Sequence, residues 1–146
     1  MKLDLDEGKS FKEVFLLTNK KKYKKMLGSK VQEFINVVEN EEFEYDYLYD
    51  LSYKLIEFIH KSDAKGITQL ADKQGELWAK SGIDVTLKID WFDAFTEVYW
   101  EFLSFYYEKQ EFDVQRFFQL QKETTRFFNV YLRQFIKSYD VYQQKS

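Results

Sequence analysis

Apolar residues recur at three- and four-residue steps along most of the chain, and they are densest in residues 89–107. Two neighbouring apolar rows in this stretch follow the period of a helix, and only an acidic edge interrupts them. The first row is Ile89, Phe92, Phe95, Tyr99, Phe102 and Tyr106, and the second is Trp91, Phe95, Val98, Phe102 and Phe105. A helix that is apolar over most of its circumference is normally surrounded by other helices. The pattern therefore predicts a central helix, whose broad face contacts other helices, a ligand or a second chain.

Two helix starts are predicted in the N-terminal part of the chain. Ser10 and Glu13 have the spacing of a capping box, as do Ser29 and Gln32. Gly28 stands between the two pairs and is the expected stop of the first helix, since glycine tolerates the left-handed conformation that often ends a helix. A third helix is expected from residue 45 to residue 60.

Aspartates predict the starts of the last three helices. Ser62 or Asp63 precedes the first of them, Asp84 precedes the aromatic helix, and Asp113 precedes the last helix. Gly82 is the expected stop before the aromatic helix. The short segment 85–89 is the only candidate for a strand. The sequence therefore predicts an all-α, single-domain protein of about six helices over residues 1–146.

A basic run, N-K-K-K-Y-K-K, occupies residues 19–25. Such a run is typical of a surface that contacts phosphates or an anionic membrane. It is equally typical of a solvated helix end, where lysines are stabilised by the negative pole of the helix dipole. Because no arginine accompanies the lysines, the second interpretation is favoured.

Composition narrows the possible functions. The chain has no cysteine and a single histidine, which disfavours metal sites, thiol nucleophiles and histidine-based catalysis. Phosphate-binding loops and the G-x-S-x-G motif are also missing, so no enzymatic activity is expected. A net charge of −3 gives no general attraction to nucleic acid. With an acidic N-terminus and no apolar run of roughly 20 residues, the chain is expected to be cytoplasmic and not stably inserted in a membrane.

The single histidine, His60, lies at the end of the third predicted helix. The favoured interpretation is a partly exposed side chain stabilised by the helix dipole. The alternatives are a pH-sensitive group or a haem ligand.

Three cations lie within the apolar rows of the last two helices, namely Lys88, Arg126 and Arg133. An apolar cavity with a cation at its end suits a fatty-acid carboxylate or another anion, since the acyl chain gains roughly 0.8 kcal/mol per buried methylene and the head group gains a charge-assisted bond. Aromatic residues make up 20% of the chain and would line such a cavity. The alternative is that these cations are surface residues paired with nearby carboxylates.

The segment W-A-K-S-G-I-D-V-T-L-K-I-D-W-F-D-A-F, residues 78–95, resembles a specific group of globin-like proteins. In the non-haem globin sensor domains of stressosome RsbR-type proteins, a helix ends in a small polar turn with glycine, and a short apolar-acidic segment opens the next long helix. Gly82, Ile83 and Asp84 follow this pattern. In length and aromatic content the chain is most similar to the stand-alone sporulation-inhibitory sensor-domain proteins of bacilli.

The resemblance implies a dimeric, globin-like sensor domain that binds a fatty acid where haem would sit, together with a small anion such as chloride. It also implies inhibition of sporulation, either by competition with a sensor histidine kinase for the signal ligand or by pairing with the kinase's sensor domain. Haem itself is not expected, because no histidine occurs in the segment directly before the aromatic helix, where a proximal ligand would stand, and His60 lies too early in the chain. The alternative from another class is a ligand-free interaction module that docks on a kinase or on its own copy.

Two sets of residues follow from these hypotheses. The expected ligand site is Leu70, Trp78, Lys88, Ile89, Phe92, Phe95, Arg126, Phe128, Leu132 and Phe135. The expected dimer interface is Tyr106, Tyr107, Tyr139 and Tyr142.

Overall fold

The computed structural model describes residues 11–38 and 45–144, which are helical apart from short turns. Within these ranges, six helices confirm the predicted all-α class and the predicted number of helices. No strand occurs among the described residues, and the candidate segment 85–89 forms the first turn of a helix. The helices are α1 (Phe11–Thr18), α2 (Lys20–Val38), α3 (Tyr45–His60), α4 (Ala64–Lys80), α5 (Val85–Glu108) and α6 (Val114–Gln144).

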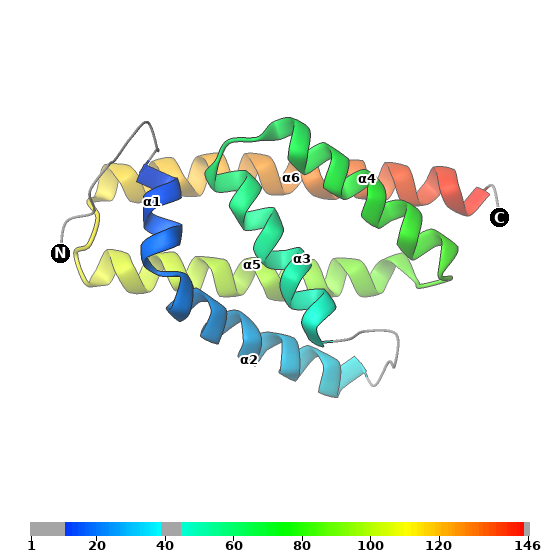
Figure 1. Ribbon diagram of the computed structural model, residues 1–146, viewed down its shortest axis with the longest axis horizontal. Helices are drawn as coiled ribbons and strands as arrows, with labels where there is room; N and C mark the ends of the chain where they lie inside the picture. Colours follow the sequence, from blue (N-terminus) through cyan, green and yellow to red (C-terminus); the bar gives the residue numbers. More distant parts are fainter. Residues whose placement is uncertain (1–10, 39–44, 145–146) are drawn as a thin grey trace.

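The two longest helices, α5 and α6, run antiparallel along the long dimension of the molecule (Figure 1). α4 lies along α6 and makes the most extensive helix–helix contact with it. α2 packs against α5, and α3 connects the two sides by contacting both α2 and α4. The interior is therefore enclosed by helices that are far apart in the sequence.

Local caps position the last three helices as predicted. Asp63, Asp84 and Asp113 each accept a hydrogen bond of 2.9 Å from a backbone amide in the first turn of α4, α5 and α6. Gly82 has a φ of +68° and reverses the chain after α4. Because each cap involves residues two or three positions apart, these boundaries were readable from the sequence.

The predicted helix stop at Gly28 is wrong, because α2 continues through Gly28 and Ser29. The break lies instead at Asn19, which is buried and whose side-chain amide donates to the carbonyl of Phe15 at 3.0 Å. Ser29 is not a cap, since its hydroxyl donates to the Lys25 carbonyl one turn earlier, and Ser10 lies outside the described residues. A glycine inside a helix costs about 1 kcal/mol, which the buried stripe of Tyr23, Leu27, Val31 and Phe34 offsets.

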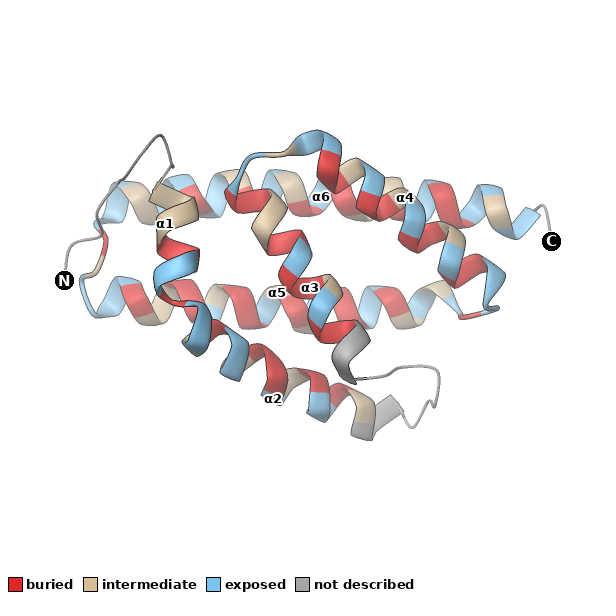
Figure 2. Cartoon of the chain, viewed as in Figure 1, coloured by how far each residue is buried: buried red, intermediate tan, exposed pale blue. Residues whose placement is uncertain are grey.

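The core is aromatic, and buried residues recur along the helices, where they alternate with exposed ones (Figure 2). Phe102 lies at its centre with rings of α1 and α2 around it, 5.3 Å from Phe15 and 4.9 Å from Tyr23. Gly75 lets α4 approach α6 closely, since a Cβ there would lie 2.7 Å from the carbonyl oxygen of Phe135. These contacts fix the rotational setting of each helix about its own axis.

Candidate functional site

Most of the predicted ligand-binding residues meet in the interior between α4, α5 and α6. Leu70, Trp78, Phe92, Phe95, Phe128 and Phe135 are all buried. The ring of Phe128 lies 5.6 Å from Phe92 and 5.5 Å from Phe95, and Trp78 lies 5.7 Å from Phe135. These centroid distances and the edge-on angles are those of favourable aromatic pairs.

Lys88 is the unusual member of this group, because only 3% of its surface is exposed. Its Nζ lies 5.0 Å from the ring centroid of Trp78, 5.2 Å from Tyr131 and 4.9 Å from Phe135, so three rings surround the ammonium group. Among the described residues no carboxylate lies within ion-pair distance of Nζ. Burial lowers the pKa of Lys88 to about 7.

The space beside Lys88 is small. The cavity there has a volume of about 10 Å³, and it is lined by Leu51, Ser52, Leu55, Lys88, Trp91, Phe92, Phe95 and Tyr131. This volume accommodates about one water molecule, whereas pockets for organic ligands occupy roughly 300–1,000 Å³. Among the described residues, side chains therefore fill the space beside Lys88 where the ligand was expected.

Three predicted ligand-binding residues lie elsewhere than expected. Ile89 is 37% exposed. The inward side of α5 at this point is formed by Lys88 and Phe92, which are buried, and Ile89 lies outside that side. Arg126 is exposed, since it lies two positions from both Thr124 and Phe128, which face inward on α6. Leu132 is only half-buried.

Tyr131, which was not among the predicted residues, is buried, and its ring centroid lies 5.8 Å from that of Phe92. It belongs to an inward row of α6, the residues Leu120, Thr124, Phe128, Tyr131 and Phe135. That row has helical spacing, so it was readable from the sequence. Arg133, like Arg126, is exposed and does not lie in the apolar interior.

Two of the four predicted dimer-interface tyrosines are core residues, and this part of the prediction is wrong. Tyr106 is buried edge-on against Phe15 at 5.4 Å. Tyr139 is 6% exposed, and its hydroxyl donates to the carbonyl of Ile83 at 2.6 Å. Tyr142 is half-buried and Tyr107 is 37% exposed, so only these two remain available to a second chain.

His60 is buried, with 1% of its surface exposed, and not partly exposed as predicted. Its Nδ1 contacts the carbonyl oxygen of Lys12, which can only accept, so Nδ1 carries the proton. Nε2 then accepts from the hydroxyl of Tyr99 at 2.6 Å. The Tyr99 oxygen in turn lies 3.5 Å from the hydroxyl of Thr124. This polar chain joins α1, α3, α5 and α6 through one neutral imidazole.

Acid is expected to destabilise the protein through His60. Burial lowers its pKa from 6.5 to about 4, so the unfolded chain binds the proton more tightly. The stability that His60 contributes is therefore complete above pH 6.5 and is lost as the pH falls toward 4. We expect a loss of about 2 kcal/mol between pH 7.5 and pH 5, measured by urea unfolding.

A His60→Gln variant isolates this effect, since the chain has no other histidine. The variant is expected to be less stable at pH 7.5 but to change less between pH 7.5 and pH 5. An equal acid dependence in both proteins would show that the imidazole is not the group responsible.

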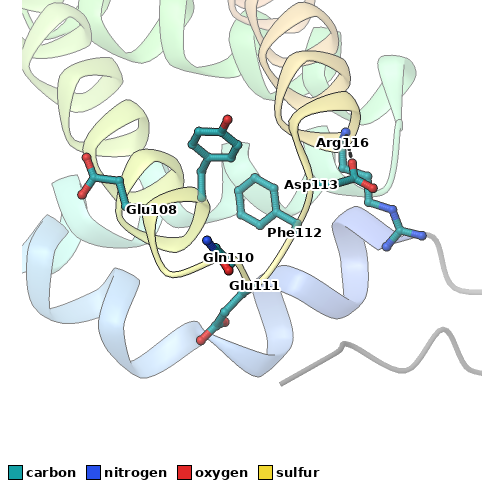
Figure 3. A pocket seen from close by; sticks show the side chains of 7 residues that line it. Glu108, Gln110, Glu111, Phe112, Asp113 and Arg116 are labelled. Atoms are coloured by element: carbon teal, nitrogen blue, oxygen red, sulfur yellow. Dashed lines mark hydrogen bonds between the residues drawn. The ribbon is translucent and has the colours of Figure 1, made fainter.

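Two larger hollows open on the surface of the described part of the chain. One, of about 740 Å³, lies at the turn between α5 and α6, where Glu108, Glu111 and Asp113 line it together with Arg116 (Figure 3). The other, of about 270 Å³, lies between α1 and α3. Neither coincides with the predicted ligand site, because none of the ten residues predicted for that site lines either hollow.

Comparison with protein-family models, with curated proteins and with solved structures found no match to this chain. Among the described residues no three His, Asp or Glu side chains are grouped so that they would hold a metal ion. None of the helices in residues 11–38 and 45–144 combines the length and apolarity needed to cross a bilayer.

Proposed function

We propose that this protein is a globin-like sensor domain that binds an apolar carboxylate such as a fatty acid, with Lys88 as the partner of the carboxylate. The observation that carries the proposal is the burial of Lys88 in an aromatic cage, with no acidic group in ion-pair distance among the described residues. A buried cation without a counter-charge is unfavourable for folding. A bound carboxylate or chloride ion would supply that charge through a charge-assisted hydrogen bond.

The acyl chain would pack among Phe92, Phe95 and Phe128, which are buried next to one another beside the lysine. Each methylene transferred into this environment contributes about 0.8 kcal/mol. Because the cavity is only about 10 Å³, these rings must move apart when an acyl chain enters. A chloride ion requires a much smaller displacement.

The resemblance to non-haem globin sensor domains supports a mode of action. A sensor domain of this kind would lower the input to sporulation by competing with a sensor histidine kinase for the fatty acid, or by pairing with the kinase's sensor region. It would also form a homodimer, for which Tyr107 and Tyr142 remain accessible. Light scattering of the purified protein tests the dimer, and a strict monomer would contradict it.

Mass spectrometry of lipid extracted from the purified protein tests the ligand. We expect an acyl carboxylate from the wild type and from a Lys65→Met variant, in which an exposed lysine of α4 is replaced. We expect none from Lys88→Met. If no acyl ligand is recovered from the wild type and added fatty acids give no thermal shift, the proposal fails.

The filled interior favours a second candidate, a ligand-free module that acts only by docking on a kinase or on its own copy. In this case the buried aromatic residues serve stability alone. The response of the core to added volume separates the two candidates, because a site that opens for a ligand tolerates a larger side chain and a fixed core does not.

Phe95→Trp measures this tolerance. Phe95 is 1% exposed and contacts both Phe92 and Phe128, so a fixed core is expected to lose about 1–3 kcal/mol. Ile89→Trp, on the exposed side of the same helix, is the control and is expected to be nearly neutral. Urea unfolding of both variants gives the comparison, and a neutral Phe95→Trp would favour the ligand-binding candidate.

A further inference from the structure

Positive charge is concentrated at the start of α2. This helix contains six lysines and one glutamate, whereas the whole chain has a net charge of −3. The first six residues of α2 include five of its six lysines, namely Lys20, Lys21, Lys22, Lys24 and Lys25. We call these five residues the α2 lysine cluster. Four of them are exposed and Lys22 is half-buried.

Helix stability does not explain the α2 lysine cluster. The sequence suggested that the lysines end a helix, where the dipole stabilises them, but the structure places them at the first turns of α2. There the positive pole of the dipole and repulsion between lysines three or four positions apart are both unfavourable. Among the described residues none of the five ammonium groups forms an ion pair with a carboxylate.

Aromatic rings hold three of these lysines against the surface of the protein. Such contacts restrain the side chains without neutralising their charge, so the ammonium groups stay available to a partner. The lysine–ring pairs are Lys20 with Tyr53 at 5.2 Å, Lys22 with Phe105 at 4.6 Å and Lys24 with Tyr49 at 5.4 Å. Lys109 extends the charge, since its Nζ lies 4.7 Å from the same Phe105 ring.

An exposed apolar side chain adjoins the cluster. Leu17 is 54% exposed at the end of α1, three residues before Lys20. It lines the 270 Å³ groove between α1 and α3 together with Tyr53, whose ring lies under Lys20. Glu13 and Glu57 also line this groove. The positive surface therefore follows α2, with Leu17 at its edge, and does not continue into the groove.

We propose that the α2 lysine cluster, with Leu17 beside it, docks peripherally on an anionic lipid bilayer. Clusters of four to eight basic residues on a helix are attracted to anionic headgroups, each contributing separately. Lysine suits this partner, because a diffuse layer of headgroups does not require the fixed fork of arginine. Leu17 adds apolar area at the headgroup boundary. α2 lies on the side of the molecule away from α4, and its outward turns are exposed (Figures 1 and 2).

Cosedimentation with vesicles tests the proposal. Wild-type protein is mixed with phosphatidylcholine vesicles, either pure or containing about 30% phosphatidylglycerol as the anionic lipid. The test variant is Lys21→Gln/Lys24→Gln/Lys25→Gln. The matched control, Lys65→Gln/Lys73→Gln/Lys137→Gln, removes the same charge from exposed positions of α4 and α6. Circular dichroism checks that both variants are folded.

We expect the wild type to sediment only with the anionic vesicles, and to be released at high salt. The test variant is expected to bind about 100-fold more weakly, whereas the control binds like the wild type. Equal binding to neutral vesicles, or an equal loss in the control, would overturn the proposal. Absence of wild-type binding at low salt would also overturn it and would point to an acidic protein as the partner. The vesicles contain no fatty acid, so the result is independent of the function proposed above.

Discussion

Replacing Lys88 by methionine is expected to stabilise the protein at pH 7 by about 2–4 kcal/mol while abolishing binding of an anionic ligand. Burial lowers the pKa of this lysine from 10.5 to about 7, so the unfolded chain holds the proton more tightly than the folded one. The penalty is complete below pH 7 and disappears as the pH rises toward 10.5. Methionine fills a similar volume and has no charge to desolvate.

Urea unfolding of the two proteins between pH 7 and pH 10 tests this expectation. The stability difference between wild type and Lys88→Met should shrink as the pH rises. Lys65→Met, at an exposed position of α4, should leave stability nearly unchanged at every pH. A clear loss of stability in Lys88→Met at pH 7 would instead mean that the ammonium group has a stabilising partner. A gain in stability together with a loss of binding is the pattern of a residue kept for function.

Phe102→Ala is expected to lower the free energy of unfolding by about 3–5 kcal/mol. The side chain is fully buried, and its ring contacts Phe15 of α1, Tyr23 of α2 and Tyr106 of α5. Truncation removes these contacts and leaves a cavity where three helices meet. Because those neighbours are themselves packed against other rings, the cavity is not expected to collapse.

Ile89→Ala is the matched control for this prediction. It truncates an apolar residue of the same helix that is 37% exposed, so we expect a loss of less than about 1 kcal/mol. Urea unfolding measures both variants at the same pH. If Phe102→Ala lost no more than Ile89→Ala, the core would not be centred on α5 as described.

The sequence by itself determined the helical class and most helix boundaries. Asp84 and Asp113 were identified correctly, and Asp63 was one of two candidates, because a cap and its amide lie within three residues and the interaction is local. Gly28 was misinterpreted for the opposite reason. Whether a glycine ends a helix depends on what the helix buries on either side of it, and α2 buries Tyr23 and Val31.

Only the tertiary structure decided which side of α5 faces inward and which polar groups are buried. On α5 the apolar rows cover so much of the circumference that periodicity could not tell whether Lys88 or Ile89 is buried. In the structure Lys88 is buried and Ile89 is partly exposed. His60 was expected to be partly exposed because it ends a helix. It is buried because α5 places Tyr99, 39 positions later in the chain, within hydrogen-bond distance of its Nε2. Contacts between residues far apart in the sequence decide the burial of Lys88 and His60, and the pattern along one helix carries no information about such contacts.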